Sequence, residues 1–117
     1  MTPSLPIKPM TNDSQSRLSN AQTKQYRAIA HKLSPVVTIA SNGLSDAVML
    51  ELERALSDHE LIKVKIAVGE REARDLIIEQ LCDRTSAQLV QRIGNTATLL
   101  RRAPKPDPRK SNLHRAL

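Results

Sequence analysis

Aromatic side chains are almost absent from this sequence. Tyr26 is the one aromatic residue, and the chain has no phenylalanine or tryptophan. RNA-recognition-motif sheets and single-strand-binding barrels stack bases on aromatic side chains. The sequence therefore excludes such stacking platforms, and any binding of nucleic acid would have to use the backbone and the phosphates.

Cysteine and long hydrophobic runs are also scarce. Cys82 is the only cysteine, which excludes an intramolecular disulfide, and its place in the run LIIEQLC favours a buried apolar thiol. The longest uncharged stretch, residues 33–45, is shorter than the ~20 apolar residues that span a bilayer. Residues 1–18 lack the charged start and hydrophobic core of a signal peptide. We therefore expect a soluble, cytoplasmic protein without a membrane partner.

Signals of catalysis are missing as well. His31, His59 and His114 have no mutual metal-ligand spacing, and no cysteine cluster accompanies them. No nucleophile elbow, P-loop or dinucleotide fingerprint occurs, and the carboxylates are typical of surface charge. We expect no catalytic residue, no metal and no cofactor.

The charge that is present is unevenly distributed. The formal net charge is +6, and residues 101–117 alone carry six basic side chains against Asp107. Residues 19–43 contain three basic residues and no acid, whereas residues 44–60 contain five acids against Arg54. A basic tail beside a basic edge is typical of nucleic-acid binding, although a tail that only improves solubility would look the same.

Helix signals occur at three places. Ser19 and Gln22 have the spacing of a capping box, and Pro35 ends the helix that follows. Ser45 is a good N-cap for a second helix. The third helix is predicted in residues 70–85, where apolar residues recur at helical spacing.

Strand signals lie between and after these helices. The predicted strands cover residues 36–40, 61–68, 87–93 and 96–101, with a tight turn at Gly94 and Asn95 between the last two. In residues 61–68, apolar side chains alternate with Lys63 and Lys65. The predicted fold is one α/β (α+β two-layer) domain, in the order α-β-α-β-α-β-β, with three helices and a four-stranded sheet. The sheet should be mixed, because strands joined through a helix are expected to pair in parallel and the closing hairpin adds an antiparallel pair.

The chain divides into a domain and two tails. We predict a flexible N-terminal extension in residues 1–17, the domain in residues 18–102, and a flexible basic tail in residues 103–117. Pro104, Pro106 and Pro108 lie in a charged run that is not expected to pack. The length suits one domain with one core, and we expect a monomer.

The segment PVVTIASNGLSDAV, residues 35–48, is the best candidate for a binding site. A β-branched run turns through Ser41, Asn42 and Gly43 into a helix start, where backbone N–H groups and the helix dipole favour an anion. A loop of small residues also lets the backbone lie close to a phosphate, as in KH domains. An ordinary strand-to-helix turn, with Gly43 in a left-handed conformation, is the alternative.

Three motifs in order, SNGLSDAV, HELIKVKIAVGERE and QRIGNTATLL, resemble the CRM (chloroplast RNA splicing and ribosome maturation) domain in its stand-alone bacterial form, the YhbY family. The similarity covers about residues 18–102. It implies a domain related to the C-terminal domain of a bacterial translation initiation factor, with a GxxG loop and a basic surface that bind RNA. It also implies association with precursors of the large ribosomal subunit.

By this resemblance, the GxxG loop corresponds to Ala40, Ser41, Asn42 and Gly43, with Ala40 in place of the first glycine. A backbone angle open only to glycine would be strained there by the methyl group. The predicted RNA-binding site consists of this loop, in which the three amides of residues 41–43 would hold a phosphate, and of the basic residues Lys24, Arg27, Lys32, Lys63 and Lys65. The function expected from the resemblance is non-catalytic binding of large-subunit rRNA precursors during ribosome assembly.

Two other functions remain open from the sequence. The acidic second helix, with Glu51 and Glu53, could dock on a ribosomal protein or another assembly factor. Alternatively, the basic tail alone could bind RNA without specificity. Because the chain has one tyrosine and a loop of small residues, we expect it to read backbone shape more than bases.

Overall fold

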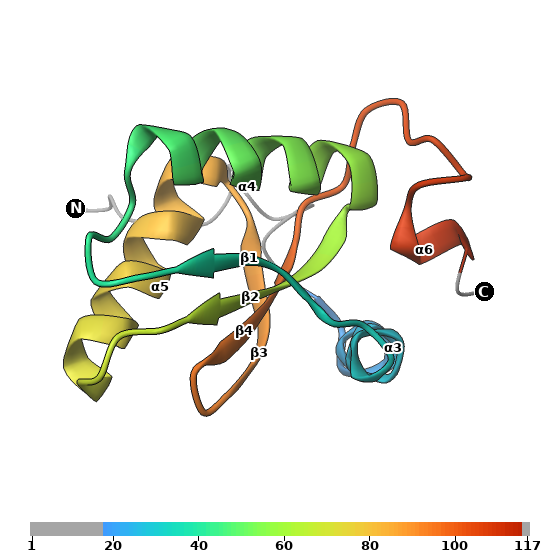
Figure 1. Ribbon diagram of the computed structural model, residues 1–117. Helices are drawn as coiled ribbons and strands as arrows, with labels where there is room; N and C mark the ends of the chain where they lie inside the picture. The colour runs from blue at the N-terminus through green and yellow to red at the C-terminus, as the bar shows by residue number, and fades with distance from the viewer. Residues whose placement is uncertain (1–17, 116–117) are drawn as a thin grey trace, which may run out of the picture.

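The structure is a computed structural model that describes residues 18–115. It contains one four-stranded sheet with helices on both faces (Figure 1). The elements in chain order are α3 (Asn20–His31), β1 (Pro35–Ile39), α4 (Asp46–His59), β2 (Leu61–Ile66), α5 (Arg71–Thr85), β3 (Gln88–Ile93), β4 (Thr96–Leu100) and α6 (Asn112–Arg115). The predicted fold class and order are confirmed, and the short α6 was not predicted.

The predicted helix starts are also confirmed. Ser19 Oγ accepts a hydrogen bond from the Gln22 amide at 3.0 Å, and Gln22 Oε1 accepts one from the Ser19 amide at 3.0 Å. Ser45 Oγ accepts from the Val48 amide at 3.2 Å. These side chains satisfy amides that the first helical turn leaves without a partner.

The sheet has the strand order β1-β2-β4-β3. β1 pairs with β2 in parallel, while β4 pairs with both β2 and β3 in antiparallel fashion. The prediction that strands joined through a helix pair in parallel therefore holds for β1 and β2. It is wrong for β2 and β3, because the closing hairpin inserts β4 between them.

β2 ends at Ile66, two residues earlier than predicted. Arg74 of α5 donates to the carbonyls of Val68 and Gly69, at 3.0 and 2.9 Å. The arginine thus binds the backbone carbonyls that follow the strand, so that this segment turns towards α5.

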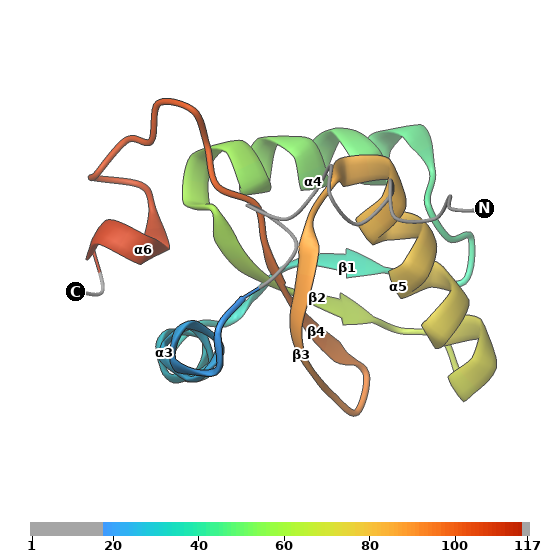
Figure 2. The same cartoon turned by 180° about the vertical axis from the view of Figure 1, so that it is seen from behind.

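The two faces of the sheet are covered differently. Ile62, Val64 and Ile66 of β2 belong to the main core with α4 and α5, whereas Leu61 belongs to a second cluster with α3. Because side chains alternate along a strand, α3 lies on the opposite face from α4 and α5. The views from the two sides show α3 near one end of this face only (Figures 1 and 2). The remainder of that face is not covered by a described helix.

The prediction that residues 103–117 do not pack is wrong for the described part of this segment. Ser111 is fully buried, and its hydroxyl donates to Glu60 Oε1 at 2.6 Å. The Ala103 amide donates to Glu60 Oε2 at 2.6 Å, and Asn112 Nδ2 donates to the Leu61 carbonyl at 2.6 Å. Leu113 packs on the second cluster. The prolines restrict the segment, but its polar groups and Leu113 still attach it to the domain.

Glu60 is the residue on which this attachment depends. Its side chain is 2% exposed, and its backbone has a positive φ of 62° at the end of α4. We predict that Glu60→Ala lowers the free energy of unfolding by about 2–3 kcal/mol, because it leaves buried donors without an acceptor. Ser111→Ala removes one donor and should cost about 1 kcal/mol.

Urea denaturation checks this prediction, with Glu51→Ala on the exposed surface of α4 as the matched control. Equal stabilities of Glu60→Ala and Glu51→Ala would contradict the structural role of Glu60.

Candidate nucleic-acid interface

The loop after β1 is a tight turn. The Gly43 amide donates to the Ala40 carbonyl at 2.9 Å, and the Ser45 amide donates to the Gly43 carbonyl at 3.0 Å. Ser41 and Asn42 are exposed, and no hydrogen bond joins their amides to another described residue. Two loop amides, rather than the three expected, therefore remain for a phosphate in this conformation.

The start of α4 offers less to an anion than its sequence indicated. Ser45 Oγ already accepts from the Val48 amide, and Asp46 places a carboxylate in the first turn. This carboxylate interacts favourably with the helix dipole and repels a phosphate. An anion is thus better held by the loop amides than by the helix terminus.

Ala40 fits its position without strain. Among the described residues other than glycine, only Glu60 and Ser86 have a positive φ, whereas Gly43 has a φ of 72°. The alanine in place of the family's first glycine therefore needs no glycine-only angle. Gly43 does need one, although a Cβ at this position would meet no atom within 4 Å.

The uncovered sheet face carries two of the predicted cations. Lys63 and Lys65 both point to this face, because they alternate with the buried residues Ile62, Val64 and Ile66. Lys65 is exposed and Lys63 is half-buried, and no ion pair joins either to a described residue. The strand register places two rows of side chains across this face: Thr38, Lys65, Thr96 and Ile93, and next to it Pro35, Lys63, Thr98 and Gln91.

The loop and α3 lie at opposite ends of this face. The loop follows Ile39, which pairs with Ile66 at the end of β2, whereas α3 packs on Leu61 at its start. β2 spans about 17 Å between these ends. Lys63 and Lys65 therefore lie between α3 and the loop.

The cations of α3 point to solvent. Lys24 is exposed on the side of α3 opposite its buried residues, Arg27 is exposed on a flank of the helix, and Lys32 is the exposed C-cap. Gln25 lines a hollow against the C-terminal segment. Because Arg27 follows Gln25 by about 200° around the helix, it lies on the flank away from that segment. The structure thus brings Lys63 and Lys65 together with the loop, but it places the α3 cations at the other end of the face.

Several arginines that contribute to the net charge have structural partners. Arg92 pairs with Asp75, and Arg102 donates to the Tyr26 hydroxyl at 2.6 Å. Arg101 donates to Glu53 Oε1 at 2.8 Å and to the Thr85 carbonyl at 3.0 Å. Of the two acids proposed for docking through the second helix, Glu53 is therefore engaged within the domain.

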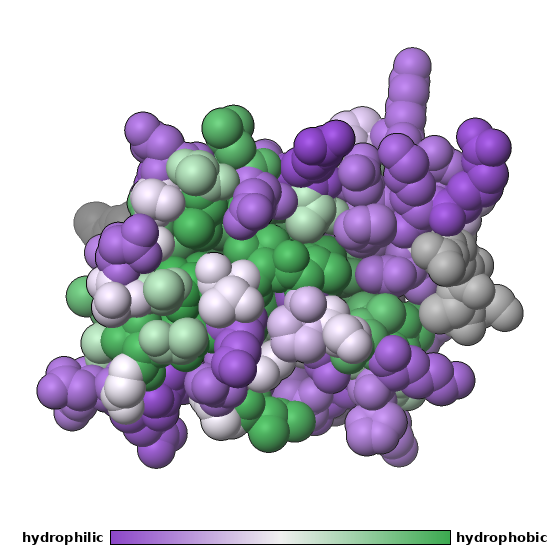
Figure 3. Space-filling model, viewed as in Figure 1, coloured by the Kyte–Doolittle hydropathy of each residue, from purple (hydrophilic) through white to green (hydrophobic). Residues whose placement is uncertain are grey.

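Hydrophilic residues are concentrated over the C-terminal segment and α3 (Figure 3).

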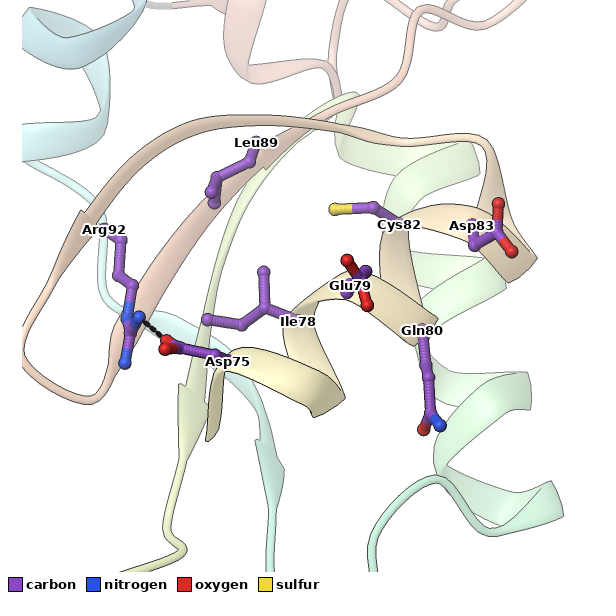
Figure 4. Close-up of a pocket in the computed structure, with 8 residues that line it drawn as sticks. All are labelled: Asp75, Ile78, Glu79, Gln80, Cys82, Asp83, Leu89 and Arg92. Atoms are coloured by element: carbon purple, nitrogen blue, oxygen red, sulfur yellow. Dashed lines mark hydrogen bonds and ion pairs between the residues drawn. The ribbon is translucent and has the colours of Figure 1, made fainter. Parts of the chain in front are cut away.

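A groove of 770 Å³ lies on the other side of the sheet, between α5 and β3 (Figure 4). Its lining residues are Asp75, Ile78, Glu79, Gln80, Cys82, Asp83, Leu89 and Arg92. Leu89 and Arg92 pair with Leu99 and Ala97 of the main core, so the groove opens on the face of α4 and α5. Its carboxylates disfavour a phosphate, and none of the predicted site residues lines it.

The described part of the chain contains no group of three or more histidine, cysteine or acidic residues arranged to hold a metal ion. None of the described helices is long and apolar enough to cross a membrane.

Comparison with known proteins identifies the family. Residues 18–101 match the model of the CRS1 / YhbY (CRM) domain. The chain belongs to this CRM family. A probable RNA-binding protein of Pseudomonas aeruginosa is 48% identical over 98 residues, which cover 84% of this chain and 94% of the relative. An RNA-binding protein of Haemophilus influenzae is 45% identical over 84 residues, covering 72% of this chain and 85% of the relative.

A solved structure shares the CRM fold found here. The solution structure of a hypothetical protein from Staphylococcus aureus, described as a candidate RNA-binding protein, aligns with a TM-score of 0.66 and 26% identity. The alignment covers 76% of this chain and 93% of that protein.

The sequence did not identify Thr38, Thr98 or Gln91 as neighbours of the predicted lysines. The signal that would have found Thr98 is the alternation of Thr96 and Thr98 with Ala97 and Leu99, which gives the last strand one polar face. Only the observed strand order and register place that polar face beside Lys63.

The loop geometry predicts how two substitutions change the stability of the protein. Gly43→Ala should lower the free energy of unfolding by about 1 kcal/mol, because alanine disfavours the positive φ. Ala40→Gly should lower it by about 0.5 kcal/mol, because glycine gives the unfolded chain more freedom. Chemical denaturation measures both, and stabilisation by Ala40→Gly would show that alanine is strained in this loop.

The burial of Cys82 in the groove predicts how the reactivity of its thiol depends on pH. Burial, with a smaller contribution from Asp83, raises the pKa of the half-buried Cys82 thiol from 9.0 to about 11. The thiolate is the reactive form, so at pH 8 its population should be about 100-fold below that of a thiol with the ordinary pKa. The rate of reaction with iodoacetamide should still increase steeply as the pH passes 10, whereas a midpoint near pH 9 followed by a plateau would contradict the burial.

Proposed function

We propose that this CRM protein binds RNA without catalysis, through the uncovered sheet face between the loop and α3. The main support for the proposal is the order of the groups along this face. The Ser41 and Asn42 amides lie at one end, Lys65 and Lys63 follow along β2, and the exposed cations of α3 lie at the other end. These amino groups and amides suit successive phosphates of one strand. The two relatives are named as a probable RNA-binding protein and an RNA-binding protein.

The proposal extends to a cellular role. We infer that the protein acts in the cytoplasm, as a monomer, on precursors of the large ribosomal subunit during its maturation. The support for this role is the resemblance of the three sequence motifs to the YhbY family. The polarised charge adds support, because a basic face opposite an acidic groove favours one orientation on RNA.

Charge reversal on α3 tests the RNA interface. Lys24→Glu combined with Arg27→Glu should weaken binding to a large-subunit rRNA fragment, because two attractive interactions with phosphates become repulsive. The slope of log K against log salt should fall in magnitude by about 1.4, or about 0.7 for each phosphate that the variant no longer neutralises. The thermal midpoint should stay nearly unchanged, since both side chains are exposed.

Arg54→Glu combined with Arg84→Glu is the matched control, because it changes the net charge equally on α4 and α5. Titration by fluorescence anisotropy at several salt concentrations compares the two double variants. Equal decreases in affinity would assign the effect to net charge and remove α3 from the interface.

Sedimentation tests the cellular role. The tagged protein should migrate with immature large subunits from gently lysed native cells, and sequencing should find precursor large-subunit rRNA enriched with it. Migration at the top of the gradient without enriched RNA would contradict the assembly role. Association that is abolished by Glu51→Lys but kept with the α3 double variant would instead support docking through α4.

A further inference from the structure

The uncovered sheet face contains a hollow of 200 Å³ to which all four strands contribute. The residues that line it are Pro35, Lys63, Gln91, Ile93, Thr96 and Thr98. Pockets for drug-sized ligands have volumes of ~300–1,000 Å³, so this hollow suits a smaller group. Four of its lining residues belong to the row of Lys63, and the other two, Thr96 and Ile93, belong to the row of Lys65.

The floor of the hollow contains an unpartnered polar side chain. Thr98 is 3% exposed, and its hydroxyl makes no hydrogen bond with another described residue. Because Thr98 lines the hollow, a polar group that enters the hollow can become the hydrogen-bond partner of this hydroxyl. The half-buried side chains of Gln91 and Lys63 line the same hollow, and neither has a described side-chain partner.

We propose that this hollow holds one unstacked base of the bound RNA. A base is flat, with apolar faces and an edge of hydrogen-bond donors and acceptors. Pro35 and the exposed Ile93 supply apolar walls, while the Thr98 hydroxyl and the Gln91 amide can each donate and accept. The inference rests on the proposed RNA binding and adds to it a site at which sequence is read.

The cations around the hollow fit this assignment. Lys63 lines it, and Lys65 lies two residues further along β2 towards the loop. The phosphates on either side of an inserted base would therefore meet Lys65 and the loop amides in one direction and α3 in the other. An aromatic platform is not needed, because the base is held at its edge and between aliphatic side chains.

Binding of short RNAs tests the proposal. The probes are the ten-nucleotide RNAs oligo(U), oligo(C), oligo(A) and alternating (UG)5, titrated by fluorescence anisotropy into the full chain. The wild-type protein should prefer one of them by about tenfold. Thr98→Val and Gln91→Leu should each weaken binding of that RNA about three- to tenfold, the range expected for one hydrogen bond, and leave the others and the salt slope unchanged.

Thr38→Val is the matched control, because Thr38 lies on the same face but does not line the hollow. It should leave the preference intact. Thermal midpoints show whether each variant folds. If Thr98→Val is unstable, Gln91→Leu on the edge strand still tests the site.

Uniform binding of all four RNAs by the wild type, or an equal decrease in affinity for all RNAs in both variants, would overturn the base site alone. Absence of binding to these probes and to the rRNA fragment would overturn the proposed function as well.

Discussion

The two-sided environment of β2 is the constraint on which the rest of the structure depends. This strand pairs with β1 on one side and with β4 on the other. The hydrogen bonds on both edges fix which side chains point to each face of the sheet. Ile62, Val64 and Ile66 are buried against α4 and α5, and burial of three such side chains contributes several kcal/mol. Lys63 and Lys65 must therefore point to the opposite face. The residues that stabilise the core also aim the cations of the proposed interface.

The helices then divide the surface into regions of different chemistry. α5 and β3 enclose a groove with carboxylates at its rim, whereas α3 covers one end of the other face and leaves the lysine rows open. The C-terminal segment closes the second cluster through Glu60, Ser111 and Leu113. It lies beyond residues 18–101, which match the family model.

Local sequence signals predicted the elements well. The capping box at Ser19, the N-cap at Ser45 and the alternation around Lys63 each depend on residues that are close in the chain. The insertion of β4 beside β2 and the docking of Ser111 on Glu60 depend on contacts between residues far apart in the sequence. Patterns of neighbouring residues cannot predict such contacts. The same limit hid the relation of Thr98 and Gln91 to Lys63. The Gly43 amide is a different case, because its acceptor, the Ala40 carbonyl, lies only three residues away and depends on the turn geometry.

The central claim is that RNA lies along the uncovered sheet face from the loop to α3. Photo-cross-linking measures this directly: the full chain is irradiated with large-subunit rRNA fragments that contain 4-thiouridine, and mass spectrometry locates the linked residues. Cross-links are expected in the loop at Ser41 and Asn42 and in the two side-chain rows that contain Lys63 and Lys65. Cross-links confined to α4, α5 or the C-terminal segment would contradict it.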